Sequence, residues 1–185
     1  MKMYSTNNGI TLLKIFVYLL FCAYITSGCR NETKDQIITI IDSFYTREVA
    51  GDYRLSNKKL MTKELGDLIE RASQKQASES DTMKKYGSTE KPNMIEGDIF
   101  TSVFEGSTSH KIESISYTES KAEVLVVFTN SNYEMHTWKE HVLLKKEQGG
   151  WKINDVKYAA GKGGGAGTQD VLNKFLQLPA VTPHN

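Results

Sequence analysis

Apolar residues recur at three- and four-residue intervals in the first half of the chain. From Asp35 to about Val49 the repeating positions are Ile37, Ile38, Ile40, Ile41, Phe44 and Tyr45. This spacing predicts an amphipathic helix that ends before Gly51. A second helix is predicted from about Ser56 to Ala77, where apolar residues alternate in the same way with lysines and glutamates. Residues 78–92 are polar and contain a glycine and a proline, so an exposed loop is predicted there.

In the second half of the chain the pattern changes period: residues 112–117 and 133–146 alternate between apolar and polar positions, and residues 122–128 are a β-branched run. Strands are predicted over Ile112–Tyr117, Ala122–Phe128, Tyr133–Lys146 and Trp151–Tyr158. The last two are separated by the turn signal Gln148-Gly149-Gly150. A glycine-rich stretch, Gly161–Gly167, is predicted to be a flexible linker, and Thr168–Leu178 a final helix with Thr168 as its cap. Helices followed by antiparallel strands indicate an α+β fold.

The amino terminus has the layout of a secretory signal. Lys2 and Lys14 are the only charges before an apolar run over residues 15–25, which gives way to Thr26-Ser27-Gly28-Cys29. The apolar run is about half of the roughly 20 residues that a membrane-spanning helix needs. The small residues ending at Cys29 resemble the lipobox of bacterial lipoproteins, in which the cysteine carries the lipid and the signal is removed before it. An ordinary signal with an incidental cysteine, or an uncleaved anchor, is the alternative.

This reading divides the chain into four parts. They are a signal peptide over residues 1–28, a lipidated tether over 29–34, a folded domain over 35–178 and a tail over 179–185. The expected location is the bacterial cell envelope, with attachment to the membrane through lipid on Cys29. Because Arg30 follows the cysteine, where aspartate would favour inner-membrane retention in enterobacterial sorting, the outer membrane is favoured over the inner membrane.

Composition narrows the classes of function. The chain has 185 residues and a formal net charge of +1, which fits one modest domain and supplies no basic field for nucleic acid. There are 2 cysteines. Cleavage before Cys29 would remove Cys22 and leave Cys29 blocked by lipid, so cysteine catalysis, cysteine-bound zinc and a disulfide are all excluded by this reading.

Five segments, in their order along the chain, resemble the DUF3828 lipoproteins, and the resemblance covers most of residues 35–178. The segments are Phe44-Tyr45 in the first helix, Leu60 in the second helix, Glu96-Gly97-Asp98-Ile99-Phe100-Thr101-Ser102, a valine-rich strand, and Gly150-Trp151-Lys152-Ile153-Asn154-Asp155-Val156. The resemblance implies the NTF2-like or cystatin-like fold: a curved antiparallel sheet packed against N-terminal helices, with a short C-terminal helix. Enzymes and non-catalytic binding proteins both use such folds, so the fold leaves the activity open.

Candidate chemistry was sought among the titratable side chains. His136 alternates with Trp138 and Glu140 on one strand face and His141 falls on the other, so the two histidines are not expected to form a dyad. Clustered histidines and metal-binding motifs are missing from the sequence, and we expect neither a metal nor a cofactor. Asp98 and Asp155 are candidate carboxylates, each expected to be structural more often than catalytic. The glycine-rich stretch lacks the lysine position of a phosphate-binding loop.

These observations favour a non-catalytic, lipid-anchored envelope protein that binds a partner protein or a small ligand. An immunity-type or inhibitor protein that blocks a toxin is one specific form of this hypothesis. The residues expected to contribute to the ligand or partner surface are Tyr45, Asp98, His136, Trp138, Trp151 and Asp155. The alternatives are an envelope enzyme that uses His136 and Asp98 as acid–base groups in a cone-shaped pocket, and a purely structural envelope component.

Overall fold

A computed structural model describes residues 32–46, 58–89, 91–103, 106–132, 135–159 and 166–181. The predicted signal peptide and Cys29, the linker residues 161–165, Phe104 and residues 182–185 lie outside the described residues. The chain divides into two units, residues 1–37 and 38–185. The helix over residues 32–46 crosses that boundary, and the description below concerns the second unit. None of the helices in the described residues is both long and apolar enough to cross a membrane.

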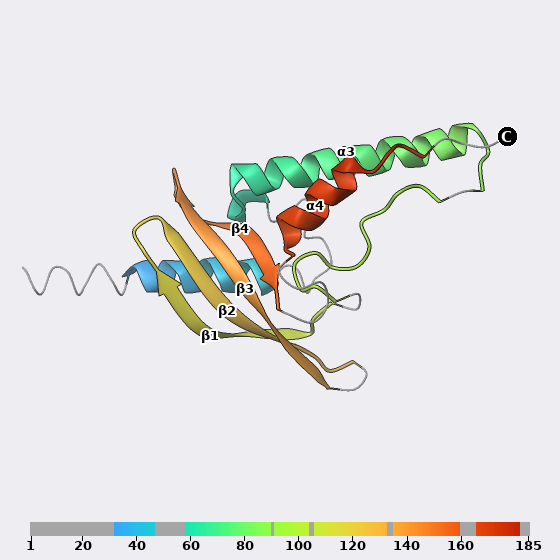
Figure 1. Ribbon diagram of the computed structural model, residues 1–185. Helices are drawn as coiled ribbons and strands as arrows, with labels where there is room; N and C mark the ends of the chain where they lie inside the picture. The colour runs from blue at the N-terminus through green and yellow to red at the C-terminus, as the bar shows by residue number, and fades with distance from the viewer. Residues whose placement is uncertain are drawn as a thin grey trace, which may run out of the picture. The chain divides into compact units, whose positions relative to one another are not determined.

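Four antiparallel strands form an open sheet in the order in which they follow one another along the chain (Figure 1). They are β1 (Ser109–Tyr117), β2 (Lys121–Asn130), β3 (His136–Glu147) and β4 (Gly150–Tyr158). All four predicted strands are confirmed, with ends that differ by a few residues. The predicted turn before β4 is also confirmed: Gly149 and Gly150 have φ angles of 97° and 117°, which side chains other than hydrogen disfavour. The α+β class follows directly from these elements.

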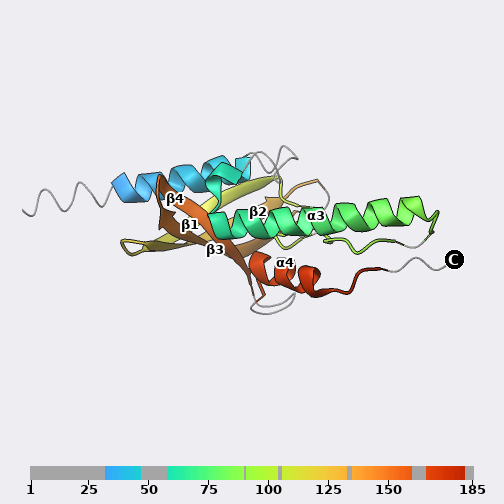
Figure 2. The same ribbon diagram turned by 90° about the horizontal axis from the view of Figure 1, so that it is seen from above.

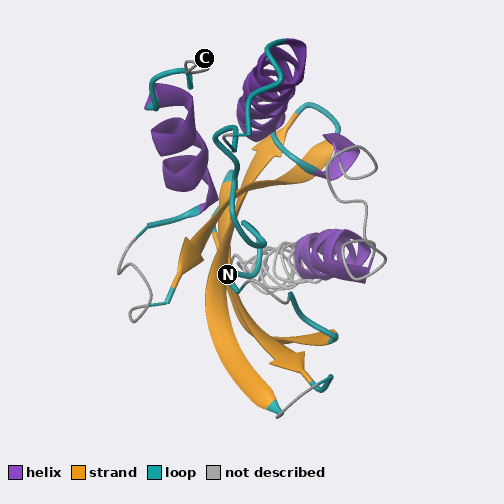
Figure 3. Cartoon of the chain, turned by 90° about the vertical axis from the view of Figure 1, so that its right-hand side faces the viewer, coloured by secondary structure: helices purple, strands orange, loops and turns teal. Residues whose placement is uncertain are grey.

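The core lies on the concave side of the sheet, against residues 38–46 of the first helix (Figure 3). Alternate residues of β2, among them Val124, Val126 and Phe128, are completely buried. Rings from the helix meet them, with the Tyr45 ring centroid 4.8 Å from that of Phe128. Burying a side chain of this size contributes about 1.5–3 kcal/mol, so the helix and the sheet stabilise one another.

The second helix begins later and ends later than the sequence pattern predicts. A short 3₁₀ turn, η1 (Lys58–Leu60), leads into α3 (Lys63–Lys85). Thr62 caps α3, since its side chain accepts a hydrogen bond from Leu65 N, and its own N–H donates to Ile153 O of β4 at 2.8 Å. This contact with the sheet fixes where the helix starts.

The loop predicted over residues 78–92 is wrong for residues 78–85, which form the last turns of α3. Glu79 is 5% exposed in this part of the helix. Its carboxylate accepts hydrogen bonds from Lys75 Nζ at 2.6 Å and from Asn93 N at 3.0 Å. The burial of Glu79 could not be predicted from its polar surroundings in the sequence. Its carboxylate is satisfied by Lys75 of the same helix and by the backbone of Asn93, which follows the helix.

The last helix, α4 (Thr168–Gln177), lies beside α3 (Figure 2). Ala166 and Gly167, directly before it, are bonded to the end of β4. Tyr158 N donates to Ala166 O at 2.9 Å, and Gly167 forms an isolated bridge with Lys157. The prediction of a flexible linker is therefore wrong for Gly167, which is held against the end of β4.

Candidate functional site

Residues 98–103, called the 98–103 loop below, are held from several sides by side chains of other elements. The Ile99 carbonyl accepts two hydrogen bonds, from the Tyr158 hydroxyl of β4 at 2.7 Å and from Thr168 Oγ1 of α4 at 2.6 Å. Burial raises the pKa of Tyr158 above its ordinary value, and nearby carboxylates act in the same direction. Tyr158 is therefore a neutral donor at physiological pH.

The next two carbonyls of this loop are bound in the same way. Phe100 O accepts from the Tyr45 hydroxyl at 3.3 Å, and Thr101 O accepts from Trp138 Nε1 at 2.7 Å. Tyr45 is completely buried and Trp138 is half-buried. Tyr45 and Trp138, which were predicted to form a partner surface, thus hydrogen-bond to the backbone of the 98–103 loop. Each bond satisfies a carbonyl oxygen that has lost contact with water.

Asp98 organises the start of the loop. Its Oδ1 accepts from Phe100 N at 2.8 Å and its Oδ2 accepts from Thr101 Oγ1 at 2.6 Å. An aspartate that bonds to the backbone two residues later forms the usual Asx turn. Both carboxylate oxygens already have a protein donor, which matches the structural role expected for Asp98.

Glu140 is the most unusual titratable group on the inner face of the sheet. Its side chain is buried, with 1% of the residue exposed. It accepts hydrogen bonds from Ser102 Oγ and from Ala159 N, the second at 2.7 Å. Burial raises the pKa of this carboxyl above its usual range, although the two hydrogen bonds oppose that shift.

Ser102, which donates a hydrogen bond to Glu140, has an uncommon backbone conformation. Ser102 is in the left-handed region with φ of 58°. Such a conformation in a residue other than glycine costs about 1–3 kcal/mol and persists where surrounding contacts hold it. Sequence reasoning placed Glu140 on the same strand face as His136 and Trp138 but did not single it out. A charge on the same face as a large aromatic residue was the available signal.

A cavity of about 230 Å³ lies beside the loop. It is lined by Glu96, Gly97, Asp98, Ile99, Ser102, Val103, Tyr158 and Val171. The Asp98, Ser102 and Tyr158 side chains all bind protein groups. These three polar side chains of the cavity wall are therefore already engaged in hydrogen bonds that stabilise the fold.

His136 lies apart from that cavity. It is exposed at the start of β3, and its ring stacks on Trp138 with centroids 5.5 Å apart. His141 lies on the opposite face and pairs with Glu123 through Nδ1 at 2.5 Å. The prediction that the two histidines cannot form a dyad is confirmed, and the cavity lined by Asp98 includes neither His136 nor Asp155.

Asp155 and Trp151, both on β4, are buried. Asp155 Oδ1 accepts from Val156 N at 2.9 Å and from Gln169 N at 3.0 Å, so this carboxylate fastens the start of α4 to the sheet. Trp151 is 2% exposed, and its Nε1 has no hydrogen-bond partner among the described residues. Of the six residues predicted for a binding surface, only His136 is fully exposed, while Asp98 and Trp138 are half-buried.

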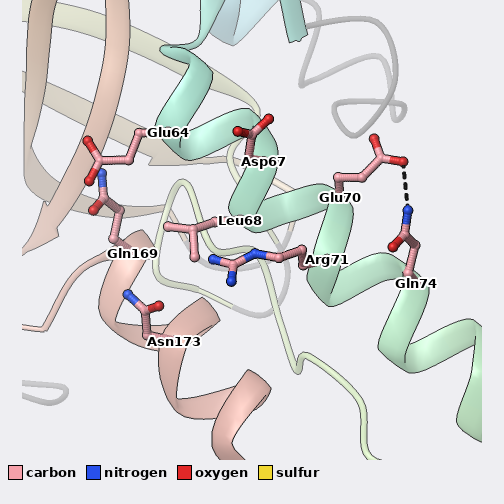
Figure 4. A pocket seen from close by; sticks show the side chains of 8 residues that line it. All are labelled: Glu64, Asp67, Leu68, Glu70, Arg71, Gln74, Gln169 and Asn173. Atoms are coloured by element: carbon pink, nitrogen blue, oxygen red, sulfur yellow. Dashed lines mark hydrogen bonds between the residues drawn. The ribbon is translucent and has the colours of Figure 1, made fainter.

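A wider opening, called the α3–α4 groove below, runs between α3 and α4 and has a volume of about 610 Å³. Its lining is almost entirely polar (Figure 4): Glu64, Asp67, Leu68, Glu70, Arg71, Gln74, Gln169 and Asn173. Sequence reasoning missed this groove, because its two walls are about 100 residues apart in the chain. The described residues contain no group of three or more His, Cys, Asp or Glu side chains placed to hold a metal ion.

Comparison with known proteins adds no relationship: no family model, curated protein or solved structure matches this chain.

Proposed function

We propose that this protein is a lipid-anchored component of a bacterial envelope whose domain binds a partner protein or a small envelope component without transforming it. The observation that carries the proposal is the contrast between two polar regions. On the inner face of the sheet, the polar side chains hold the 98–103 loop. In the α3–α4 groove, polar groups line an open surface that a ligand can reach.

We further propose that the domain is of the NTF2-like type found in DUF3828 lipoproteins. Three features support this. Residues 38–46 lie on the concave side of a curved four-stranded sheet (Figure 3). The segment Glu96–Ser102, on which the resemblance partly rests, forms the loop that four other side chains hold. The segment Gly150–Val156 forms most of β4.

The anchoring part of the proposal rests on the amino-terminal sequence. Basic residues, an apolar run and small residues ending at Cys29 occur in the order that lipoprotein signals use. Several acyl chains on one cysteine would hold the domain stably at a membrane, since each buried methylene contributes about 0.8 kcal/mol. Attachment by lipid, with the outer membrane favoured, is the location that we propose.

A purely structural envelope component is the second candidate, because the concave side of the sheet is filled by the protein's own rings. Tyr45, Phe100, Phe128 and Trp151 are each 2% exposed or less. The contacts of both residues disfavour an enzyme that uses His136 and Asp98 as acid–base groups. His136 stacks on Trp138, and both oxygens of Asp98 accept hydrogen bonds within the 98–103 loop.

The test is affinity purification of the native lipoprotein from detergent-solubilised envelopes, followed by reconstitution with each recovered component. We expect one stoichiometric partner or one retained small molecule that binds the purified protein again. Material that contains no such component after mild cross-linking would overturn the binding proposal and favour the structural candidate. A component that is chemically altered by the protein would instead favour an enzyme.

A further inference from the structure

One cation of the α3–α4 groove, Arg71, has no counter-ion among the residues that the structure describes. The three carboxylates of its lining are each paired with a lysine: Glu64 with Lys145, Asp67 with Lys63, and Glu70 with Lys58. These exposed ion pairs offset part of the negative charge on the acidic side of the groove. No ion pair in the described part of the chain involves Arg71.

The Arg71 side chain extends from α3 toward α4 across the opening (Figure 4). Leu68, which is 5% exposed, lies beside it and forms the apolar part of the lining. A guanidinium group is planar and presents five N–H donors in a fixed fork that matches a carboxylate in two-point fashion. Arg71 is exposed, so its donors are open to a ligand.

The amides of the groove do not close it. Gln169 Nε2 donates to Asn154 O at 2.7 Å, and Gln74 Nε2 donates to Glu70 at 3.1 Å. Each of these bonds uses the amide nitrogen, and the carbonyl oxygen of each amide has no hydrogen bond in the described part of the chain. Asn173 has no hydrogen bond in the described part of the chain, so it offers a donor and an acceptor. The hydrogen bond that joins α3 to the end of α4 in the described part of the chain, from Lys75 Nζ to Leu178 O at 3.0 Å, involves no residue of the groove lining.

We propose that the α3–α4 groove binds the carboxyl terminus of a peptide, with Arg71 holding the terminal carboxylate. Side-chain amides complement the main-chain N–H and C=O groups that precede it, because each amide supplies the same donor and acceptor pair. A volume of about 610 Å³ accommodates several residues rather than a lone carboxylate. The neighbouring glutamates and Asp67 disfavour a doubly charged phosphate more than a singly charged carboxylate.

This proposal rests on the proposed binding function and names the chemistry of its partner. The experiment measures fluorescence anisotropy of a fluorescein-labelled Gly-Ser-Gly-Ser-Ala-Ala peptide on the full chain in detergent micelles. The same peptide ending in a carboxamide is the matched ligand. We expect the free acid to bind at least about tenfold more tightly than the amide, because the amide lacks the charge that Arg71 pairs with.

Variants then locate the site. Arg71→Gln is expected to remove the preference for the free acid, and Arg71→Lys to retain part of it, because lysine keeps the charge without the two-point geometry. Asn173→Ala should weaken both peptides, and Lys84→Gln, an exposed cation in the last turn of α3, should leave binding unchanged. Circular dichroism checks that each variant is folded.

Equal affinity for the acid and the amide, unchanged binding by Arg71→Gln, or absence of binding would each overturn the groove assignment. Displacement of the peptide by inorganic phosphate at equal concentration would overturn the carboxylate class. The two proposals fail separately. If Arg71→Gln still recovers the envelope partner, the groove assignment fails while the binding function stands. If the wild-type chain recovers none, the binding function itself fails.

Discussion

Three aromatic side chains that carry a hydrogen-bond donor bind the backbone of the 98–103 loop. Tyr45, Trp138 and Tyr158 each bury part of an aromatic ring and donate one hydrogen bond to a carbonyl of the 98–103 loop. A buried carbonyl without a partner costs about 1–3 kcal/mol, so each bond prevents a penalty as well as making a contact. The loop therefore owes its conformation to residues that are distant in the sequence.

Thr168 offers the cleanest measurement of this effect. Thr168→Val keeps the side-chain shape and removes only the hydroxyl that donates to Ile99 O at 2.6 Å. We expect a loss of about 1–2 kcal/mol in the free energy of unfolding, since Thr168 is completely buried. Urea denaturation measures it, with the exposed Thr89→Val as control. A loss for Thr168→Val no greater than that of the control would show that Tyr158 satisfies the carbonyl unaided.

Glu140 gives the protein a dependence on pH with a defined sign. The pKa of its carboxyl is raised above its ordinary 4.5 in the folded state, chiefly by burial. Well below pH 4.5 the Glu140 carboxyl is protonated in both the folded and the unfolded protein, so folding buries no charge there. As the pH rises from 4.5 through the folded-state pKa, the unfolded state releases its proton first, so stability falls and then becomes constant.

Glu140→Gln should remove this fall, because a neutral amide can still accept from Ala159 N and donate to Ser102 Oγ. We expect the difference in unfolding free energy to move in favour of the variant as the pH rises above 4.5. Denaturation curves between about pH 4 and pH 8 measure the difference. Ser102→Ala should deepen the fall in stability, because the hydrogen bond from Ser102 opposes the pKa shift. A constant difference between Glu140→Gln and the wild type would contradict this account.

The start of α4 depends on a close approach between backbones. A Cβ atom on Gly167 would lie 2.7 Å from Val156 O, a distance that real side chains do not adopt. Asp170 Oδ2 accepts from Gly167 N at 2.9 Å, and Lys157 Nζ pairs with the same carboxylate at 2.8 Å. The pKa of Asp170 is lowered by this hydrogen bond from Lys157, whose ammonium also attracts the carboxylate. The ionised carboxylate is thereby held at the amino end of the helix.

Gly167→Ala and Gly66→Ala form a matched pair of opposite sign. Gly167→Ala should cost about 1–3 kcal/mol, because the backbone of β4 or the start of α4 must shift. Gly66 lies in the first turns of α3, where an added Cβ meets only Lys58 Cγ, at 3.8 Å. Alanine should stabilise that helix by about 0.4–1 kcal/mol. Thermal unfolding of both variants measures the effects, and equal effects of the two substitutions would refute the close-approach argument.

The location proposed for the whole protein depends on lipid attachment at one residue, Cys29. Metabolic labelling with palmitate should mark the wild-type protein and fail to mark Cys29→Ala. Cys22→Ala is the matched control, because this cysteine lies in the predicted signal and should not matter for lipid attachment. Globomycin should cause the precursor to accumulate. Label that persists in Cys29→Ala would refute lipid attachment at this position, and with it the proposed location.

Local pattern was sufficient for much of the fold. A β-branched run predicted β2. Alternation along β3 predicted that strand and the faces of His136 and His141, because successive side chains of a strand point to opposite sides. Tertiary contacts decided the ends of α3. Thr62 begins it by bonding to β4, and Glu79 is buried in its last turns because Lys75 and Asn93 satisfy its carboxylate.

The candidate site divides in the same way. Residue type alone indicated that Asp98 would bond to backbone amides, since short carboxylates do so in turns of any fold. For Asp155 it left two roles open, facing solvent or holding a loop. It could not reveal that Tyr45 and Trp151 are buried, that Glu140 meets Ser102, or that Arg71 faces α4 across an open groove. Each of these features depends on which elements pack against one another. Long-range packing decides this, and the hydrophobic pattern of a single segment does not specify its neighbours.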